Sequence, residues 1–243
     1  MTMRLDVYLF DKGLVDSRTD AKNFILSGAV SVNGKVVQKP AFDATDSDEI
    51  TVDKSGKRFV SRGGLKLEGA LDSFGINLDG AMCLDVGASS GGFTDCLLKR
   101  GATHVIAVDS GSGQMVESLR VDKRVTVIEN FNARYMQRDD FEYAPDLVVM
   151  DVSFISAKLI IPAVGGLIAD GGEFVCLIKP QFEVGRGGLN KKGIVKNDSL
   201  RRSAVDDVVE FAGCCGFSLM GIIESPITGG DGNIEYLAHF KKK

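Results

Sequence analysis

Four charged residues, two lysines and two carboxylates, have the types and settings needed to move a proton from a weakly acidic hydroxyl. Lys66 follows Gly63-Gly-Leu, Asp151 and Lys179 end apolar stretches, and Glu235 opens the final apolar stretch. A lysine whose ammonium pKa is lowered by burial or a second cation can assist deprotonation, whereas a carboxylate orients the amine and opposes the shift. Lys179 takes the central role in this hypothesis, with Asp151 beside it and the other two in support.

Each of these residues alone has an ordinary structural explanation. Lysines near strand ends usually reach solvent, and Asp151 or Glu235 could cap a turn. Four such positions at strand ends or at a domain entrance favour the chemical interpretation. They would form one group if the fourth and fifth predicted strands lie beside the first.

A glycine-rich loop follows the first predicted strand and runs from Asp85 to Phe93 as Asp-Val-Gly-Ala-Ser-Ser-Gly-Gly-Phe. Its glycines let the backbone turn sharply and approach a ligand before a helix begins. The spacing departs from the dinucleotide pattern G-x-G-x-x-G and matches the D-x-G-x-x-x-G arrangement of S-adenosylmethionine (SAM) methyltransferases. Asp85 could then accept a hydrogen bond from the methionine ammonium group.

A second carboxylate, Asp109, ends the second predicted strand, where it could hydrogen-bond a ribose diol, as in both NAD and SAM enzymes. After the third strand, Glu129, Asn130 and Asn132 could meet an adenine edge. The alternatives are a structural turn for the loop and a helix cap for Asp109. The loop and Asp109 together, at the ends of the first two predicted strands, favour a cofactor site. The predicted cofactor-binding residues are Asp85, Gly87, Ala88, Ser89, Ser90, Gly91, Gly92, Phe93, Asp109, Asn130 and Asp151.

The remaining pattern predicts two domains of different kinds. Residues 1–56 combine two short helical patterns with a hairpin turn at Asn33-Gly34, and 57–62 form a linker. Residues 63–243 alternate strands with helices, which indicates a mostly parallel sheet. The expected class is α/β, a Rossmann-like SAM-dependent methyltransferase fold with a seven-stranded sheet, preceded by a small α+β domain. The predicted strands are 82–86, 104–108, 125–128, 147–150, 173–178, 217–223 and 235–240.

Composition limits the possible ligands and the cellular location of the protein. The five cysteines include no C-x-x-C pair, and only two histidines accompany them, so a metal site is not expected. The longest uncharged stretch is too short for the roughly 20 residues of a membrane-spanning helix, and the first residues lack the apolar core of a signal peptide. We therefore expect a cytoplasmic protein without stable membrane insertion. A net charge of -4 does not by itself favour nucleic acid, so any RNA-binding face must be local.

These motifs resemble the TlyA family of haemolysin-like proteins, rRNA 2'-O-methyltransferases related to the FtsJ group. The resemblance covers nearly the whole chain and is carried by 61–67, 85–95, 151–154, 178–183 and 232–236. FtsJ-type enzymes use a Lys-Asp-Lys-Glu tetrad, which matches Lys66, Asp151, Lys179 and Glu235. The resemblance implies methyl transfer from SAM to cytidine 2'-hydroxyls in rRNA, free or in ribosomal subunits.

The first 60 residues resemble the Alpha-L RNA-binding motif of a small-subunit ribosomal protein (ribosomal-protein-S-four type). The matching residues include Arg4-Leu-Asp6, Ser17-Arg18 and Val32-Asn-Gly34. The resemblance implies RNA contacts from Arg4, Arg18, Lys22 and Lys35. The alternative is a small module with an ordinary charged surface.

A second basic stretch, from Arg186 to Arg202, follows Lys179 and is rich in glycine. It could close over RNA, or it could be a solvated mobile loop.

Three other functions of the protein remain open. They are a membrane-active haemolysin, an RNA-binding assembly factor with a vestigial methyltransferase fold, and an NAD-linked oxidoreductase, which the loop spacing disfavours.

Overall fold

The computed structural model describes residues 2–26, 28–53, 58–229 and 232–243. The chain forms two compact units, Met1–Arg58 and Phe59–Lys243. Residue 57, where the predicted linker begins, lies outside the described residues. Phe59, placed in that linker from the sequence, is 6% exposed and packs into the core of the second unit.

The first unit is a small α+β module. Its helices α1 (Leu5–Asp11) and α2 (Arg18–Leu26) pack over short strands around a core that includes Leu9, Ile25 and Val30. Asn33 and Gly34 both have positive φ, as the predicted hairpin turn between β2 and β3 requires. The strands are β1 (Met3–Arg4), β2 (Val30–Val32), β3 (Lys35–Val36), β4 (Asp43–Ala44) and β5 (Ile50–Val52).

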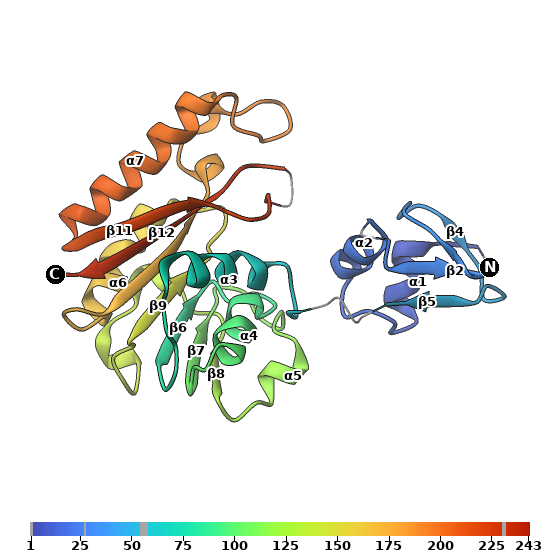
Figure 1. The fold of residues 1–243 in the computed structure, drawn as a ribbon, viewed down its shortest axis with the longest axis horizontal. Coiled ribbons are helices and arrows are strands. Elements are labelled where there is room, and N and C mark those ends of the chain that lie inside the picture. The colour runs from blue at the N-terminus through green and yellow to red at the C-terminus, as the bar shows by residue number, and fades with distance from the viewer. Residues whose placement is uncertain (1, 27, 54–57, 230–231) are drawn as a thin grey trace. The chain divides into compact units, whose positions relative to one another are not determined.

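The second unit is built on a seven-stranded sheet with the order β11-β12-β10-β9-β6-β7-β8, in which β12 runs antiparallel to both neighbours (Figure 1). This is the mostly parallel sheet that the sequence predicts. β9 pairs with β6 and β10 pairs with β9, so the fourth and fifth strands do lie beside the first. The strands are β6 (Met82–Val86), β7 (His104–Val108), β8 (Val125–Ile128), β9 (Leu147–Met150), β10 (Glu173–Ile178), β11 (Phe217–Glu224) and β12 (Tyr236–Lys242).

Helices cover both faces of this sheet, which explains why its central strands are continuously apolar. Alternate residues of each strand contribute to two separate cores. One core lies under α3 (Gly63–Phe74) and α4 (Gly92–Lys99), and the other under α6 (Ile161–Leu167) and α7 (Asp198–Cys214). The predicted helix 156–168 is divided into a 3₁₀ turn, η3 (Ala157–Leu159), and α6. The shorter elements are α5 (Glu117–Arg120), η1 (Ala133–Tyr135), η2 (Arg138–Asp140), η4 (Pro180–Phe182) and η5 (Arg186–Gly188).

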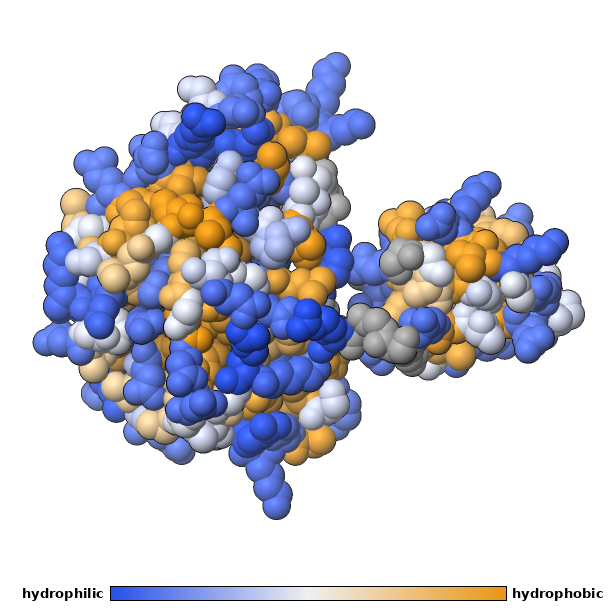
Figure 2. Space-filling model, viewed as in Figure 1, coloured by the Kyte–Doolittle hydropathy of each residue, from blue (hydrophilic) through white to orange (hydrophobic). Residues whose placement is uncertain are grey.

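The parallel strands end at one edge of the sheet, where the loops after β6, β7, β9 and β10 gather. Away from these loops, a hydrophobic patch lies over β11, the outermost strand of the sheet, where Leu219 and Met220 are exposed (Figure 2). Within the described residues, no helix is both long and apolar enough to cross a membrane.

Candidate active site

The loop after β6 depends on a glycine at position 87. Gly87 has φ 87°, and a Cβ there would collide with the backbone carbonyl of Asp151. The Asp151 amide donates to the Val86 carbonyl at 2.9 Å, which holds the two strand ends together. The close approach leaves no room for a side chain, so the backbone itself forms this wall of the site.

Asp85 lies beneath this loop and is completely buried. The Thr94 hydroxyl donates to its Oδ2 at 2.6 Å, while its Oδ1 has no partner among the described residues. Burial is the main cause that raises the pKa of Asp85 to about 7, although the Thr94 hydrogen bond opposes the shift. A buried carboxylate oxygen without a donor fits the predicted role of receiving a ligand ammonium group.

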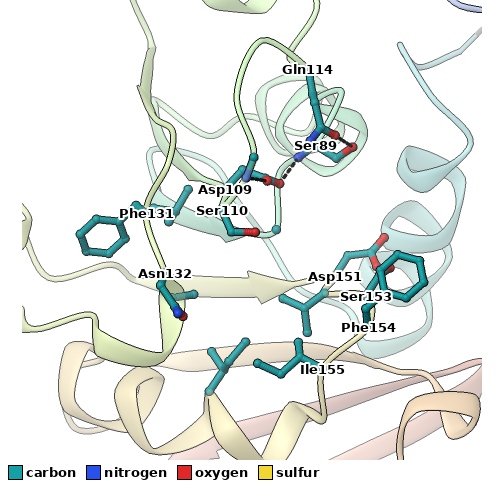
Figure 3. Close-up of a pocket in the computed structure, with 16 residues that line it drawn as sticks. Ser89, Asp109, Ser110, Gln114, Phe131, Asn132, Asp151, Ser153, Phe154 and Ile155 are labelled. Carbon is teal, nitrogen blue, oxygen red and sulfur yellow. Dashed lines mark hydrogen bonds between the residues drawn. The ribbon is translucent and has the colours of Figure 1, made fainter.

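Asp109 organises the next loop through backbone hydrogen bonds. Its Oδ2 accepts from the Ser89 amide at 2.8 Å, and its Oδ1 accepts from the Gly111 amide at 2.7 Å (Figure 3). The Ser89 hydroxyl donates to the Gln114 side chain at 3.0 Å, which ties the two loops together. Each carboxylate oxygen of Asp109 can accept a further bond, so a ribose diol remains a compatible ligand.

These loops enclose a cavity of about 460 Å³, within the usual range for a small-molecule site. Of the predicted cofactor residues, Gly87, Ser89, Asp109 and Asp151 line it. Asn130 does not line it, whereas the next residues, Phe131 and Asn132, do. The other predicted cofactor residues that do not line the cavity are Asp85, Ala88, Ser90, Gly91, Gly92 and Phe93.

The cavity wall also contains residues outside the predicted cofactor-binding set. Phe131 and Asn132 lie on one side, Gln114 lies near Asp109, and Ser153 and Phe154 lie beside Asp151 (Figure 3). The sequence predicts Asn132 as the alternative to Asn130 at the adenine edge, and it assigns no role to Gln114 or Phe131. The motif Asp-Val-Ser-Phe after β9 was the available signal for Ser153 and Phe154, because polar and aromatic residues at a strand end commonly contact ligands.

Phe154 has two unusual features. Phe154 is 91% exposed, and its backbone lies in the left-handed region with φ 65°. That conformation is unfavourable for a residue other than glycine. Its ring centroid lies 5.3 Å from that of Phe182, so the exposed ring has a partner on one side and solvent on the other.

The first of two lysine–carboxylate pairs joins the ends of β9 and β10. Lys179 Nζ lies 2.5 Å from Asp151 Oδ1 and donates to Ser153 Oγ at 2.7 Å. The Lys179 side chain is 10% exposed and that of Asp151 is 21% exposed. Since Asp151 and Ser153 both line the cavity, this ammonium group lies beside the cavity wall.

The second pair joins α3 to the residue before β12. Lys66 Nζ donates to Glu235 Oε2 at 2.5 Å, and both side chains are largely buried. Gln181 Nε2 donates to Glu235 Oε1 at 3.1 Å. Ile178 faces Tyr236 across β10 and β12, so Lys179 and Glu235 are the next residues on adjacent strands. The structure therefore brings the four predicted catalytic residues to one end of the sheet.

In the first unit, three of the predicted RNA-contacting residues surround a buried carboxylate. Arg4 makes two hydrogen bonds to Asp6, at 2.9 and 3.0 Å, and the Arg18 guanidinium lies 4.0 Å from it. Arg4, followed by the charges of Arg18 and Lys22, holds the pKa of Asp6 below its usual range. Lys22 is exposed near this group, whereas Lys35 is exposed on β3, apart from it.

The sheet order and the glycine loop after its first strand match the Rossmann-like fold of SAM-dependent methyltransferases. The chain belongs to the FtsJ-like methyltransferase family, whose model matches residues 59–242. An S4 domain model matches residues 3–50. Both matches confirm the resemblances noted in the sequence.

Relatives agree with this assignment over almost the full length. Hemolysin A of Brachyspira hyodysenteriae is 46% identical, covering 98% of this chain and 99% of the relative. The 16S/23S rRNA (cytidine-2'-O)-methyltransferase TlyA of Mycobacterium tuberculosis is 44% identical, covering 96% of this chain and 87% of the relative. A solved structure described as a hemolysin from Streptococcus thermophilus is 44% identical with a TM-score of 0.81, covering 100% of this chain and 89% of that chain.

Proposed function

We propose that this protein transfers a methyl group from SAM to the 2'-hydroxyl of cytidine ribose in ribosomal RNA. The observation that carries the proposal is the pair of lysine–carboxylate contacts at one end of the sheet, one of which borders the cavity. The 2'-hydroxyl as acceptor is supported by family membership, and cytidine in rRNA is supported by the activity for which the Mycobacterium relative is named.

Asp109, which lines the cavity, and Asp85, buried beneath the glycine loop, fit SAM. The unpaired Oδ1 of Asp85 would receive the methionine ammonium, and Asp109 would receive the ribose diol. Gly87 and Asp151, whose backbones lie in close contact, would form the wall of the cavity against which the ligand packs. When bound, SAM supplies an electrophilic methyl group on a sulfonium.

Lys179 is the residue that would hold the target hydroxyl. Once its Nζ has lost a proton to solvent, it would accept the hydroxyl proton as the hydroxyl oxygen bonds to the methyl group and S-adenosylhomocysteine leaves. Its ammonium group already contacts Asp151 and Ser153, which fix its position at the cavity border. Such positioning places the hydroxyl oxygen in line with the methyl group, and the arrangement converts a poor nucleophile into a reactive one. Glu235, held by Lys66 and Gln181, would orient the ribose from the other side.

The N-terminal unit would bind RNA through the cations around Asp6. An R18A/K22A variant is expected to weaken rRNA binding while SAM binding stays unchanged, because both residues lie in the unit that does not contain the cavity. A matched control is K12A, which removes a cation already paired with Asp46 in the same unit. Equal rRNA affinity for R18A/K22A and the wild type would exclude this unit as the RNA handle.

The decisive experiment is transfer of labelled methyl groups from SAM to ribosomal subunits and to naked rRNA, both lacking the modification. Mapping the label to a cytidine ribose would support the proposal and would identify the substrate form. Tight rRNA binding without label in any RNA, with SAM binding intact, would instead favour an RNA-binding assembly factor. Label on a base would refute the 2'-hydroxyl as acceptor.

A further inference from the structure

The segment between Lys179 and α7 carries an unusual local charge. Residues 185–197 contain four cations, Arg186, Lys191, Lys192 and Lys196, and no acidic residue, in a chain whose net charge is -4. Such a concentration in an acidic protein requires an explanation beyond an average charged surface. In Figure 1 this segment is the orange loop that leads into α7.

The centre of this segment is an ordered hairpin. Leu189 and Val195 form a bridge, and the Asn190 amide donates to the Ile194 carbonyl at 2.8 Å. The Asn190 side chain accepts from the amides of Lys192 and Ile194, at 2.8 and 3.0 Å. The turn therefore satisfies its own backbone groups, and it holds Lys191 and Lys192 at its exposed tip.

The hairpin is also anchored beside the candidate active site. Asn233, only 3% exposed, accepts from the Val195 amide and donates to the Gly193 carbonyl, both at 3.1 Å. Asn233 lies two residues before Glu235, whose carboxylate receives Lys66 and Gln181. The tip is thus fixed relative to the proposed catalytic group and is not a free loop.

The cations in and beside the hairpin make no ion pair, in contrast to several cations elsewhere in the described residues. Lys12 pairs with Asp46, Lys99 with Asp95 and Arg120 with Glu129. Over the part of the chain that the structure describes, no ion pair with a carboxylate involves Arg186, Lys191, Lys192 or Lys196; Lys196 donates to the Gly187 carbonyl instead. Exposed cations without carboxylate partners are free to neutralise phosphates.

We propose that the hairpin Leu189–Val195 is a second RNA-binding surface, which holds the phosphates flanking the nucleotide that is methylated. The inference rests on the proposed function for the identity of the RNA. It assigns to the methyltransferase unit an RNA contact of its own, independent of the S4 unit. Two fixed lysines at the tip suit a phosphate backbone, because they supply charge without a donor pattern that could read a base.

The test is rRNA binding by the full chain, measured against salt concentration with labelled unmodified rRNA. K191A/K192A is expected to weaken binding at least about tenfold at low salt and to reduce the slope of log affinity against log salt by about 1.5, the loss of two phosphate contacts. SAM affinity should not change. The matched control is K241A/K243A, which removes two exposed cations at the opposite end of β12 from Glu235 and should leave affinity and slope unchanged.

Three outcomes would overturn the proposal. They are a wild-type salt slope in K191A/K192A, an equal loss in both double variants, which would indicate a general charge effect, and a loss of SAM affinity that accompanies the loss of RNA affinity. Methyl transfer by the wild-type chain is measured in parallel. Its absence would refute the proposed function, whereas the salt slopes would still decide whether the hairpin binds RNA.

Discussion

Lys66 and Glu235 are 169 residues apart in the chain, and their side chains meet at 2.5 Å in a largely buried ion pair. Removing one partner of such a pair leaves an uncompensated charge, which typically costs about 3–5 kcal/mol. Lys66→Met is therefore expected to lower the free energy of unfolding by about 3 kcal/mol. Replacing both residues, as K66M/E235Q, should recover much of that loss, because no buried charge remains and the amide introduced by E235Q can still bond to Gln181.

Denaturant unfolding and methyl transfer separate the structural role from the proposed chemical one. The double variant should be more stable than Lys66→Met and still inactive. If the double variant regained activity together with stability, the pair would be a structural contact only, and Lys66 and Glu235 would leave the catalytic group.

Lys179 is expected to be the most sensitive position for catalysis. Lys179→Met should reduce kcat by about 10²–10⁴-fold, the usual contribution of a group that assists proton transfer, and should preserve SAM affinity. Lys123→Met provides a control, since Lys123 is exposed just before β8, at the opposite end of the sheet from the candidate site. Turnover of Lys179→Met near that of Lys123→Met would contradict the proposed role.

Asp85 should make SAM binding depend on pH. Because burial raises its pKa to about 7, the free protein holds this carboxyl protonated below that pH, whereas the ammonium contact requires the ionised form. SAM affinity is expected to fall about tenfold for each pH unit below 7, with uptake of SAM releasing a proton. Calorimetry in buffers of different ionisation enthalpy measures that proton. Asp85→Asn should bind SAM weakly and without this pH dependence.

The same shift has a defined sign for stability. An unfolded-state aspartate has a pKa of about 3.9, so the folded protein binds the extra proton between about pH 4 and 7. The wild type therefore has its highest free energy of unfolding, relative to the Asp85→Asn variant, below about pH 4. That advantage falls as the pH rises to about 7. Unfolding of the ligand-free wild type and Asp85→Asn at pH 5 and pH 8 tests this. An equal difference between the two proteins at both pH values would show that Asp85 ionises normally.

The sequence predicts this fold closely because its central strands are buried on both faces. The runs 82–86, 104–108, 147–150 and 173–178 match these strands residue for residue, and 125–128 matches the edge strand β8. The positions of Asp85, near the end of β6, and Asp109, directly after β7, follow from these strand bounds. Chain position could not reveal the partner of Lys66, however, because Glu235 reaches it through tertiary packing alone.

The positions missed from the sequence share one physical cause. Gln114, Ser153 and Phe154 lie in loops, whose course depends on contacts such as Ser89–Gln114 and Lys179–Ser153. No hydrophobic period marks residues in such loops. The basic hairpin shows the same limit, since glycine-rich composition indicates a mobile loop, while Asn190 and Asn233 fix it through side-chain hydrogen bonds.

Phe154 combines an exposed ring with a left-handed backbone beside Asp151, and this strain indicates a ligand-binding role. A ring that stacks on an RNA base typically contributes about 1–3 kcal/mol to binding. Phe154→Ala is therefore expected to raise the KM for rRNA by about tenfold, while Phe154→Tyr retains the ring and should stay near wild type. Steady-state methyl transfer at varied rRNA concentration provides the comparison.

The backbone supplies an independent check on Phe154. At an ordinary right-handed position, a protein with alanine is more stable than one with glycine. At φ 65° glycine avoids a Cβ clash that costs about 1–2 kcal/mol. Phe154→Gly should therefore unfold at a higher denaturant concentration than Phe154→Ala, although both lose the same rRNA affinity. If Phe154→Gly kept wild-type KM, the ring would have no part in substrate binding. If Phe154→Ala were the more stable variant, the left-handed backbone would not be strained, and strain could no longer be used to infer function there.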